Sequence, residues 1–295
     1  MPHPPDSILE FYTRQESQHP DATFSDYLAE LMAHPSSAVV FTPSLRDSNR
    51  PIVTIAQIRS ATDLTPRRKD HSKILQISAS TVLKVGWRVS MREAEALMLV
   101  AARTAVPVPE VFSAYMIGDV GFILMRKVEG ELLSACMESM ARDELRVIAE
   151  QLKAHVREWR TLGSTFLGSV EGGPCPDILF NHPWDYKPEG IWYEKEEALK
   201  EKKLSSTGRT LFTLGVLTHG DLHCGNIIIR HGSIAGIVDW GEAGYSLPER
   251  EFFAAKRIAL DGSWVEMINH AVPFLAEEYE LMDEIDRSMM RYSPV

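Results

Sequence analysis

The chain has 295 residues, of which 44% are hydrophobic, and a formal net charge of −10. This length can bury one full core, and the acidic balance argues against nucleic acid or an anionic membrane as the main partner. Cys136, Cys175 and Cys224 have no regular spacing, which indicates a reducing compartment. Because no apolar run could span a membrane and the start is no signal peptide, we expect a cytoplasmic protein.

Residues 1–50 are expected to form a helical N-terminal extension. Within them Phe24, Tyr27, Leu28 and Leu31 recur at helical spacing. This apolar face could pack on the rest of the chain or on a partner molecule, and the pattern leaves both open.

A segment without glycine precedes the first predicted strands. The chain has no glycine before Gly86, and residues 63–71 are polar and basic instead. Glycine lets backbone amides approach a phosphate closely, and this part of the chain offers no glycine from which such a loop could be built. Arg67, Arg68 and Lys69 could bind phosphates by charge, although a short basic run is more often a solvated loop.

The first predicted hairpin contains a lysine. Two β-rich runs, residues 74–77 and 81–85, flank a turn at 78–80, so Lys84 lies in a strand. A strand lysine is usually a solvated or edge charge unless an acid lies near it.

Such an acid is predicted in the next helix, residues 91–104. Glu93 lies on one helical face with the apolar residues Leu97, Val100 and Ala101. An acid aligned with an apolar stripe requires a cationic partner, and we pair Glu93 with Lys84. Two alternatives stay open, since Ser90-x-x-Glu93 has the form of a capping box and Glu95 is a competing acid.

A second hairpin, residues 115–125, leads into a connection at 126–130. Beyond it the pattern turns helical, with an apolar stripe that predicts a long amphipathic helix: Leu145, Ile148, Leu152, Val156 and Trp159. Residues 163–190 follow as an irregular insert rich in Gly, Pro and aromatic residues. We interpret this insert, a helix at 194–204 and the helices beyond Pro248 as the substrate side, with a packed structural excursion as the alternative.

Residues 218–229 read THGDLHCGNIII and carry the most informative pattern in the chain. Asp221 and Asn226 lie on a polar loop between an apolar run that ends at Leu217 and a β-branched run that begins at Ile227. Asp and Asn are common in turns, so this loop alone would mean little.

A second acid makes the pattern specific. A turn at 231–233 joins the run at 227–229 to another apolar run at 234–238, and Asp239 follows directly. The hairpin therefore brings Asp239 back beside Asn226. Phosphoryl transfer requires a base that orients the attacking hydroxyl and metal ions that neutralise the phosphates, and Mg²⁺ prefers carboxylate or amide oxygens.

The motif pair HGDLHCGN and DW resembles the aminoglycoside phosphotransferase branch of the protein-kinase-like fold. The resemblance spans roughly residues 50–260. It implies an α+β, two-lobed fold with a small N-terminal antiparallel sheet lobe carrying one helix and a larger, mainly helical C-terminal lobe. It also implies that Asp221 is the catalytic base and that Asn226 and Asp239 bind Mg²⁺.

The same resemblance assigns the nucleotide side and the domains. Lys84, paired with Glu93, would contact the phosphates of ATP or GTP; Met125 would back the adenine pocket, and the backbone of Arg126 and Val128 would bind the base. The expected domains are the extension 1–50, an N-lobe at 51–128 and a C-lobe at 129–295. The segment 168–175 resembles fungal members of the family.

We therefore predict a phosphotransferase acting on a hydroxyl of a small molecule, with no nucleic-acid or membrane partner. Two alternatives remain. Kinases cover the phosphates with a glycine-rich loop, and the lack of that loop here favours a kinase-fold protein that has lost or replaced phosphate transfer. The second is a zinc-dependent hydrolase with His219, Asp221, His223 and Cys224 as ligands, which would leave Asn226 and Asp239 without a role.

Overall fold

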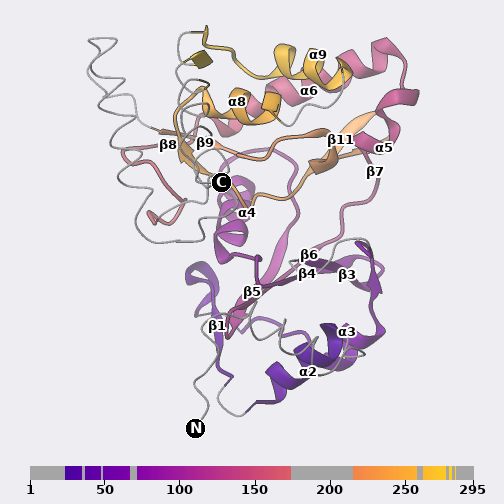
Figure 1. The fold of residues 1–295 in the computed structure, drawn as a ribbon, viewed down its shortest axis with the longest axis vertical. Coiled ribbons are helices and arrows are strands. Elements are labelled where there is room, and N and C mark those ends of the chain that lie inside the picture. Colours follow the sequence, from indigo (N-terminus) through magenta and orange to yellow (C-terminus); the bar gives the residue numbers. More distant parts are fainter. Residues whose placement is uncertain are drawn as a thin grey trace, which may run out of the picture. The chain divides into compact units, whose positions relative to one another are not determined.

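The computed structural model describes residues 24–34, 37–47, 49–66, 72–173, 215–257, 262–276, 279–280 and 283. The basic run at 67–69, the insert from 174 onward and the predicted helix at 194–204 lie outside the described residues. The chain divides into two compact units, and each is described by itself (Figure 1).

The first unit comprises Met1–Ala94 and Glu110–Lys127. It is built on an antiparallel sheet of six strands in the spatial order β1-β5-β6-β4-β3-β2. The strand bounds are β1 Val39–Phe41, β2 Thr62–Asp63, β3 Lys73–Ser78, β4 Thr81–Gly86, β5 Val111–Ile117 and β6 Val120–Arg126. Both predicted hairpins are present as β3–β4 and β5–β6, and Lys84 lies in β4 opposite Ile123 of β6.

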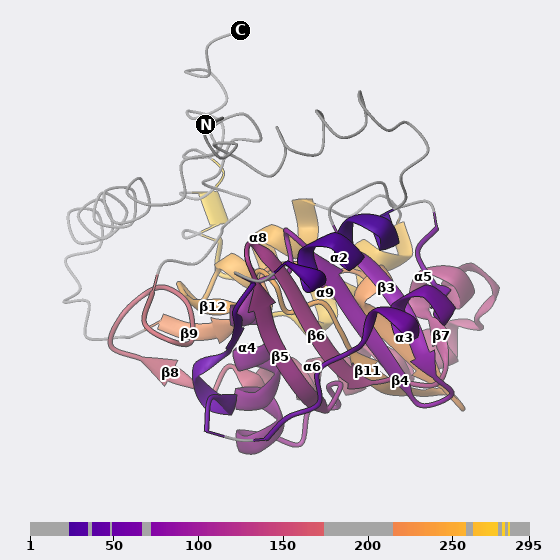
Figure 2. The same ribbon diagram turned by 90° about the horizontal axis from the view of Figure 1, so that it is seen from below.

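The N-terminal part of the chain covers one face of this sheet. It supplies α2 (Phe24–Ala33), the 3-10 helix η1 (Pro43–Leu45), α3 (Ile55–Ser60) and the edge strand β1, which pairs with β5. Figure 2 shows α2 and α3 lying across the sheet. Leu28 of α2 and Ile58 of α3 are buried in the same cluster as the sheet residues Leu83 and Phe122. The predicted apolar face of residues 24–31 therefore packs on its own chain.

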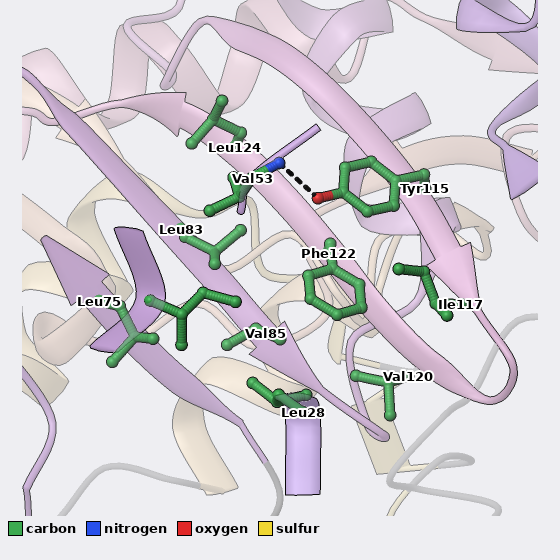
Figure 3. Packing of buried hydrophobic residues seen from close by; sticks show 11 residues of the cluster. Leu28, Val53, Leu75, Leu83, Val85, Tyr115, Ile117, Val120, Phe122 and Leu124 are labelled. Atoms are coloured by element: carbon green, nitrogen blue, oxygen red, sulfur yellow. Dashed lines mark hydrogen bonds between the residues drawn. The ribbon is translucent and has the colours of Figure 1, made fainter. Parts of the chain in front are cut away.

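Tyr115 lies at the centre of this core (Figure 3). Its ring stacks on Phe122 with 5.0 Å between ring centroids, and its hydroxyl accepts a hydrogen bond from the backbone amide of Val53 at 3.0 Å. Burial raises the pKa of Tyr115 to about 12, against the opposing effect of the Val53 amide. The buried hydroxyl thereby fixes the chain ahead of α3 to the sheet.

The second unit comprises Glu95–Pro109 and Val128–Val295. Helix α4 (Met91–Arg103) begins in the first unit and continues into the second. The other described helices are α5 Leu133–Cys136, η2 Met137–Ser139, α6 Arg142–Trp159, η3 Cys224–Asn226, α8 Arg250–Arg257 and α9 Gly262–Ala271. Helix α6 buries four of the five residues of its predicted stripe, since Ile148, Leu152, Val156 and Trp159 have no exposed surface, whereas Leu145 is only partly buried.

Two small antiparallel sheets accompany these helices. One has the order β11-β10-β7 and the other the order β12-β9-β8. The strand bounds are β7 Glu131–Leu132, β8 Gly163–Ser164, β9 Gly215–Thr218, β10 Ile227–Arg230, β11 Ser233–Ile237 and β12 Gly244–Ser246. The described start of the insert is packed on this scaffold, because β8 pairs with β9 and Gly168 bridges Tyr245. In the part of the chain that is described, no helix is both long and apolar enough to cross a membrane.

Candidate active site

The loop between β9 and β10 brings Asp221 and Asn226 together. The side-chain amide of Asn226 donates from Nδ2 to the backbone carbonyl of Asp221 at 2.9 Å and to its carboxylate Oδ2 at 3.3 Å. The turn that makes this possible is η3, which ends at Asn226 directly before β10. Asn226 is buried at 4% exposure, whereas Asp221 is partly open to solvent.

The β10–β11 hairpin returns the chain to the same place, as predicted. Ile227 pairs with Ile237, and the amide of Val238 donates to the carbonyl of Asn226 at 2.9 Å. Asp239 therefore directly follows Val238, whose backbone is bonded to that of Asn226. Its φ of 63° lies in the left-handed region, which for a non-glycine residue costs energy and often marks a functional position.

His219 ties the two segments to each other. Its Nδ1 accepts from the amide of Asp221 at 3.3 Å, and its Nε2 donates to the carbonyl of Val238 at 2.9 Å. The ring has no exposed surface and lies 4.7 Å from the ring centroid of Trp240. Because both ring nitrogens of His219 bond the backbone, neither is offered to a zinc ion. Among the residues that the structure describes, no group of three or more His, Cys, Asp and Glu side chains could hold a metal ion.

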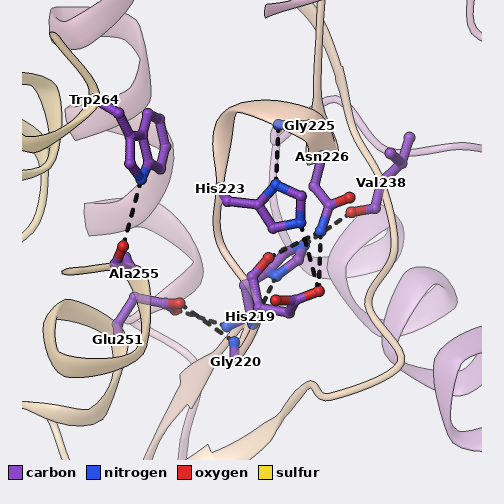
Figure 4. Close-up of polar contacts among 10 residues, drawn as sticks. His219, Gly220, His223, Gly225, Asn226, Val238, Glu251, Ala255 and Trp264 are labelled. Carbon is purple, nitrogen blue, oxygen red and sulfur yellow. Dashed lines mark hydrogen bonds and ion pairs between the residues drawn. The ribbon is translucent and has the colours of Figure 1, made fainter. Parts of the chain in front are cut away.

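Glu251 of α8 accepts hydrogen bonds from the backbone of this loop, a role that the sequence did not reveal (Figure 4). Its carboxylate accepts from the amide of His219 at 2.6 Å and from the amide of Gly220 at 3.3 Å, and it has no exposed surface. Gly220 adopts a φ of 83°, and a Cβ there would lie 2.3 Å from the carbonyl oxygen of Glu242. The only local signal was a run of charges, Glu249 to Glu251, directly before the apolar residues 252–255.

The neighbouring Arg250 is equally buried, at 1% exposure. Its Nη1 donates to the hydroxyl of Thr218 at 2.8 Å, on the strand that leads into the loop. Burial lowers the pKa of Arg160, although the carboxylates of Glu251 and Glu249 oppose this shift. Helix α8 therefore places buried charges against the loop and its preceding strand.

In the first unit the structure confirms the predicted pairing of Lys84 with Glu93. Lys84 Nζ lies 2.8 Å and 2.7 Å from the two carboxylate oxygens, and the side chains are only 8% and 3% exposed. Two side chains of opposite charge thus satisfy each other in a nearly dry setting, where an ion pair is poorly screened. Glu95, the competing acid, is also buried, at 8% exposure.

The predicted adenine-side residues continue from β6. Met125 is buried at 7% exposure. The amide of Arg126 already donates to the carbonyl of Glu110 at 2.8 Å, so a contact of Arg126 with a base would fall to its carbonyl. Within the second unit the side chain of Val128 lies against Gly236 of β11, where a Cβ would come within 2.8 Å of it.

A polar cluster joins the two ends of the glycine-free segment 63–71 through the side chains of Asp63, Thr65 and Lys73. Asp63 accepts from the amide and hydroxyl of Thr65 at 2.7 and 3.2 Å and from Lys73 Nζ at 3.0 Å. The Thr65 hydroxyl accepts in turn from the amide of Ile74 at 3.0 Å. Burial by itself raises the pKa of Asp63, but the bonds from Lys73 and Thr65 outweigh it and lower the pKa below 3.8.

Comparison with known proteins agrees with this geometry. Residues 183–284 match the model of the phosphotransferase enzyme family, APH. The structure of the streptomycin–ATP–APH(2'')-IIa ternary complex aligns with a TM-score of 0.50 at 15% identity, over 81% of this chain and 87% of that one. The fold is that of an aminoglycoside phosphotransferase. The predicted two-lobed class, with an antiparallel sheet unit and a helical unit, is thereby confirmed, as is the resemblance to the family.

Other aminoglycoside phosphotransferases align less well. ADP-bound APH(2'')-Ib has 16% identity and a TM-score of 0.49, over 78% of this chain and 80% of that one. The aminoglycoside-3'-phosphotransferase of type VIII has 18% identity and a TM-score of 0.49, over 76% and 93%. A search of curated protein sequences found no match.

The residues that an aminoglycoside phosphotransferase would use for Mg²⁺ fit that ion here. Because Asn226 directs its amide nitrogen to Asp221, its Oδ1 is the atom left to act as a metal ligand. With the carboxylate of Asp239 this makes one amide and one carboxylate oxygen, the hard donors that Mg²⁺ prefers alongside water and phosphate oxygens.

Proposed function

We propose that the protein transfers the terminal phosphoryl group of ATP or GTP to a hydroxyl group of a small molecule. The observation that carries this proposal is that Asn226 hydrogen-bonds both to Asp221 and to the amide of Val238, the residue directly before Asp239. A base beside an oxygen-donor metal site is the arrangement that phosphoryl transfer requires. The similar structure of APH(2'')-IIa is a complex with streptomycin and ATP, which supports a nucleotide donor and a small acceptor here.

Asp221 would orient the acceptor hydroxyl and take its proton. As the hydroxyl oxygen forms its bond to the γ-phosphorus, the bond to the β,γ-bridging oxygen breaks and its electrons leave with the nucleoside diphosphate. Mg²⁺ supplies charge neutralisation on the phosphates when it is bound by Asn226 and Asp239. His219 and Glu251 hold the loop backbone, so that the carboxylate of Asp221 starts the reaction in place.

The proposed nucleotide contacts come from the first unit, except for Val128, which begins the second stretch of the other unit. Lys84 is held by Glu93 and would contact the phosphates, while Met125 and the backbone of Arg126 and Val128 would form the adenine side. The buried pair supports this assignment, because a strand lysine fixed by a helix glutamate is the kinase arrangement.

The test separates binding from chemistry. Asp221→Asn should keep Mg²⁺-dependent ATP or GTP binding in calorimetry but lower turnover by roughly 10²- to 10⁴-fold, the usual contribution of a general base. Asp239→Ala should instead remove the Mg²⁺ dependence of binding. If both variants lost the same step, the separate roles would be wrong.

One observation favours a second candidate function, a kinase-fold protein that binds ligands without transferring phosphate. The chain has no glycine before Gly86, so few backbone amides can close over the phosphates. Nucleotide binding without transfer of phosphate to any acceptor, water included, would support this candidate over the first.

A further inference from the structure

Two donors approach one and the same oxygen of Asp221. Asn226 Nδ2 lies 3.3 Å from Oδ2, and His223 Nε2 lies 3.7 Å from the same atom. A carboxylate whose Oδ2 is held by the protein presents its other oxygen, Oδ1, to an acceptor hydroxyl. The geometry thus distinguishes the two oxygens of the base.

The tautomer of His223 follows from its second contact. Nδ1 accepts a hydrogen bond from the amide of Gly225 at 3.0 Å, which caps the start of η3 (Figure 4). A nitrogen that accepts cannot carry the proton, so the neutral ring carries it on Nε2, the nitrogen that faces Asp221.

The ring is oriented but still able to adjust. A Cβ on Gly225 would lie 2.7 Å from Cε1 and 2.9 Å from Nδ1 of His223, so this edge of the ring lies close against the glycine. The side chains of His223 and Asp221 are 30% and 29% exposed, which leaves room for a small movement. Catalytic hydrogen bonds are often long before the substrates bind and shorten in the complex, so 3.7 Å is a distance from which this bond can close.

We propose that His223 is a positioning residue that donates from Nε2 to Oδ2 of Asp221 and so directs Oδ1 at the acceptor hydroxyl. This inference rests on the proposed function, since it gives Asp221 the role of base. Capping of η3 alone would be the simpler role. The two roles reside on different ring nitrogens, and two substitutions separate them.

His223→Asn keeps an acceptor near the position of Nδ1 and loses the distal donor, whereas His223→Gln places its amide nitrogen near Nε2 and loses the cap. We would measure release of inorganic phosphate from Mg–ATP and Mg–GTP with water as acceptor, together with melting temperatures. His223→Asn should lower kcat about tenfold, with KM and the melting temperature nearly unchanged, as expected for loss of one hydrogen bond to a charged group. His223→Gln should rescue kcat to within about threefold while melting earlier.

His231→Asn is the matched control, because His231 is exposed at the β10–β11 turn with a φ of 53°, a conformation that asparagine tolerates. It should leave kcat unchanged. A wild-type kcat in His223→Asn, or equal losses in the Asn and Gln variants that track their melting temperatures, would overturn the proposal and leave only the cap.

A measurement without turnover keeps the inference separate from the proposed function. Nitrogen-15 NMR of the His223 ring should show the proton on Nε2, and its resonance should move in Asp221→Ala. A proton on Nδ1, or a resonance indifferent to that change, would overturn the proposal even if the enzyme is active. The wild type could also release no phosphate while the Nε2 proton is present and its resonance moves in Asp221→Ala. That result would count against phosphate transfer and would uphold the contact of His223 with Asp221.

Discussion

The lysine site of the first unit and the aspartate loop of the second hold their charged groups in opposite ways. Lys84 is held by the carboxylate of Glu93, in an ion pair that joins side chain to side chain. The loop around Asp221 is held mainly through its backbone, by Glu251 and by the ring nitrogens of His219 and His223. The backbone groups of a strand are paired with the neighbouring strands, so Lys84 needs only its side chain to be held. The amides of a loop have no such neighbours and must find other acceptors.

The difference predicts where a single substitution does most damage. Removing a loop support leaves buried backbone amides without an acceptor in addition to disturbing Asp221, the proposed base. Removing one member of the ion pair leaves one buried charge but an intact sheet.

The largest loss of stability is expected for Glu251→Ala. Two buried amides, of His219 and Gly220, lose their acceptor, and the free energy of unfolding should fall by about 4 kcal/mol. Urea denaturation would measure it. Glu266→Ala, on an exposed position of α9, is the control and should change stability by less than about 0.5 kcal/mol. A loss for Glu251→Ala as small as that of the control would mean that the loop holds itself.

A smaller loss is expected for Lys84→Met, which leaves the carboxylate of Glu93 buried without its cation. Stability should fall by about 3 kcal/mol, and Lys84→Met with Glu93→Leu should recover most of that, because the stranded charge is gone. Arg59→Ala breaks an ion pair with Asp26 whose side chains are 56% and 54% exposed, and should cost less than about 1 kcal/mol. Additive losses in the double variant would show that the two side chains do not act as a pair.

A smaller loss than that of Lys84→Met is expected for Asp63→Asn, at the start of the glycine-free segment 63–71. The change weakens the bonds from Thr65 and Lys73 and should cost about 1 kcal/mol near neutral pH. Because the folded-state pKa of Asp63 lies below 3.8, its contribution is fully present above that value and is lost as the pH falls through the folded-state pKa. Melting curves between neutral and acidic pH should therefore converge for the two proteins, and a constant difference would contradict the assignment.

What the sequence predicted correctly rests on local patterns. The hairpin that carries Lys84 and the helix that carries Glu93 each show their own periodicity, and their spacing of nine residues allows the pairing. The loop from Asp221 to Asn226 lies between two apolar runs, so its geometry was also local.

What the sequence did not reveal depends on contacts between distant segments. Glu251 meets the amide of His219 across 32 residues, and Val53 meets Tyr115 across 62. No periodicity of the sequence encodes such contacts. In the sequence, a buried acid near the start of a helix also looks the same as a capping acid. The pairing of β1 with β5 was missed for a different reason, since three residues are too few to show the alternation of a strand.

Asp239 carries a consequence for how this chain can evolve. Its left-handed backbone costs roughly 1 kcal/mol for a residue with a side chain, and glycine would remove that cost. Replacement by glycine would also remove the carboxylate and the interactions it makes. If Asp239 binds Mg²⁺ as proposed, phosphate transfer requires an aspartate at a position where the backbone alone favours glycine.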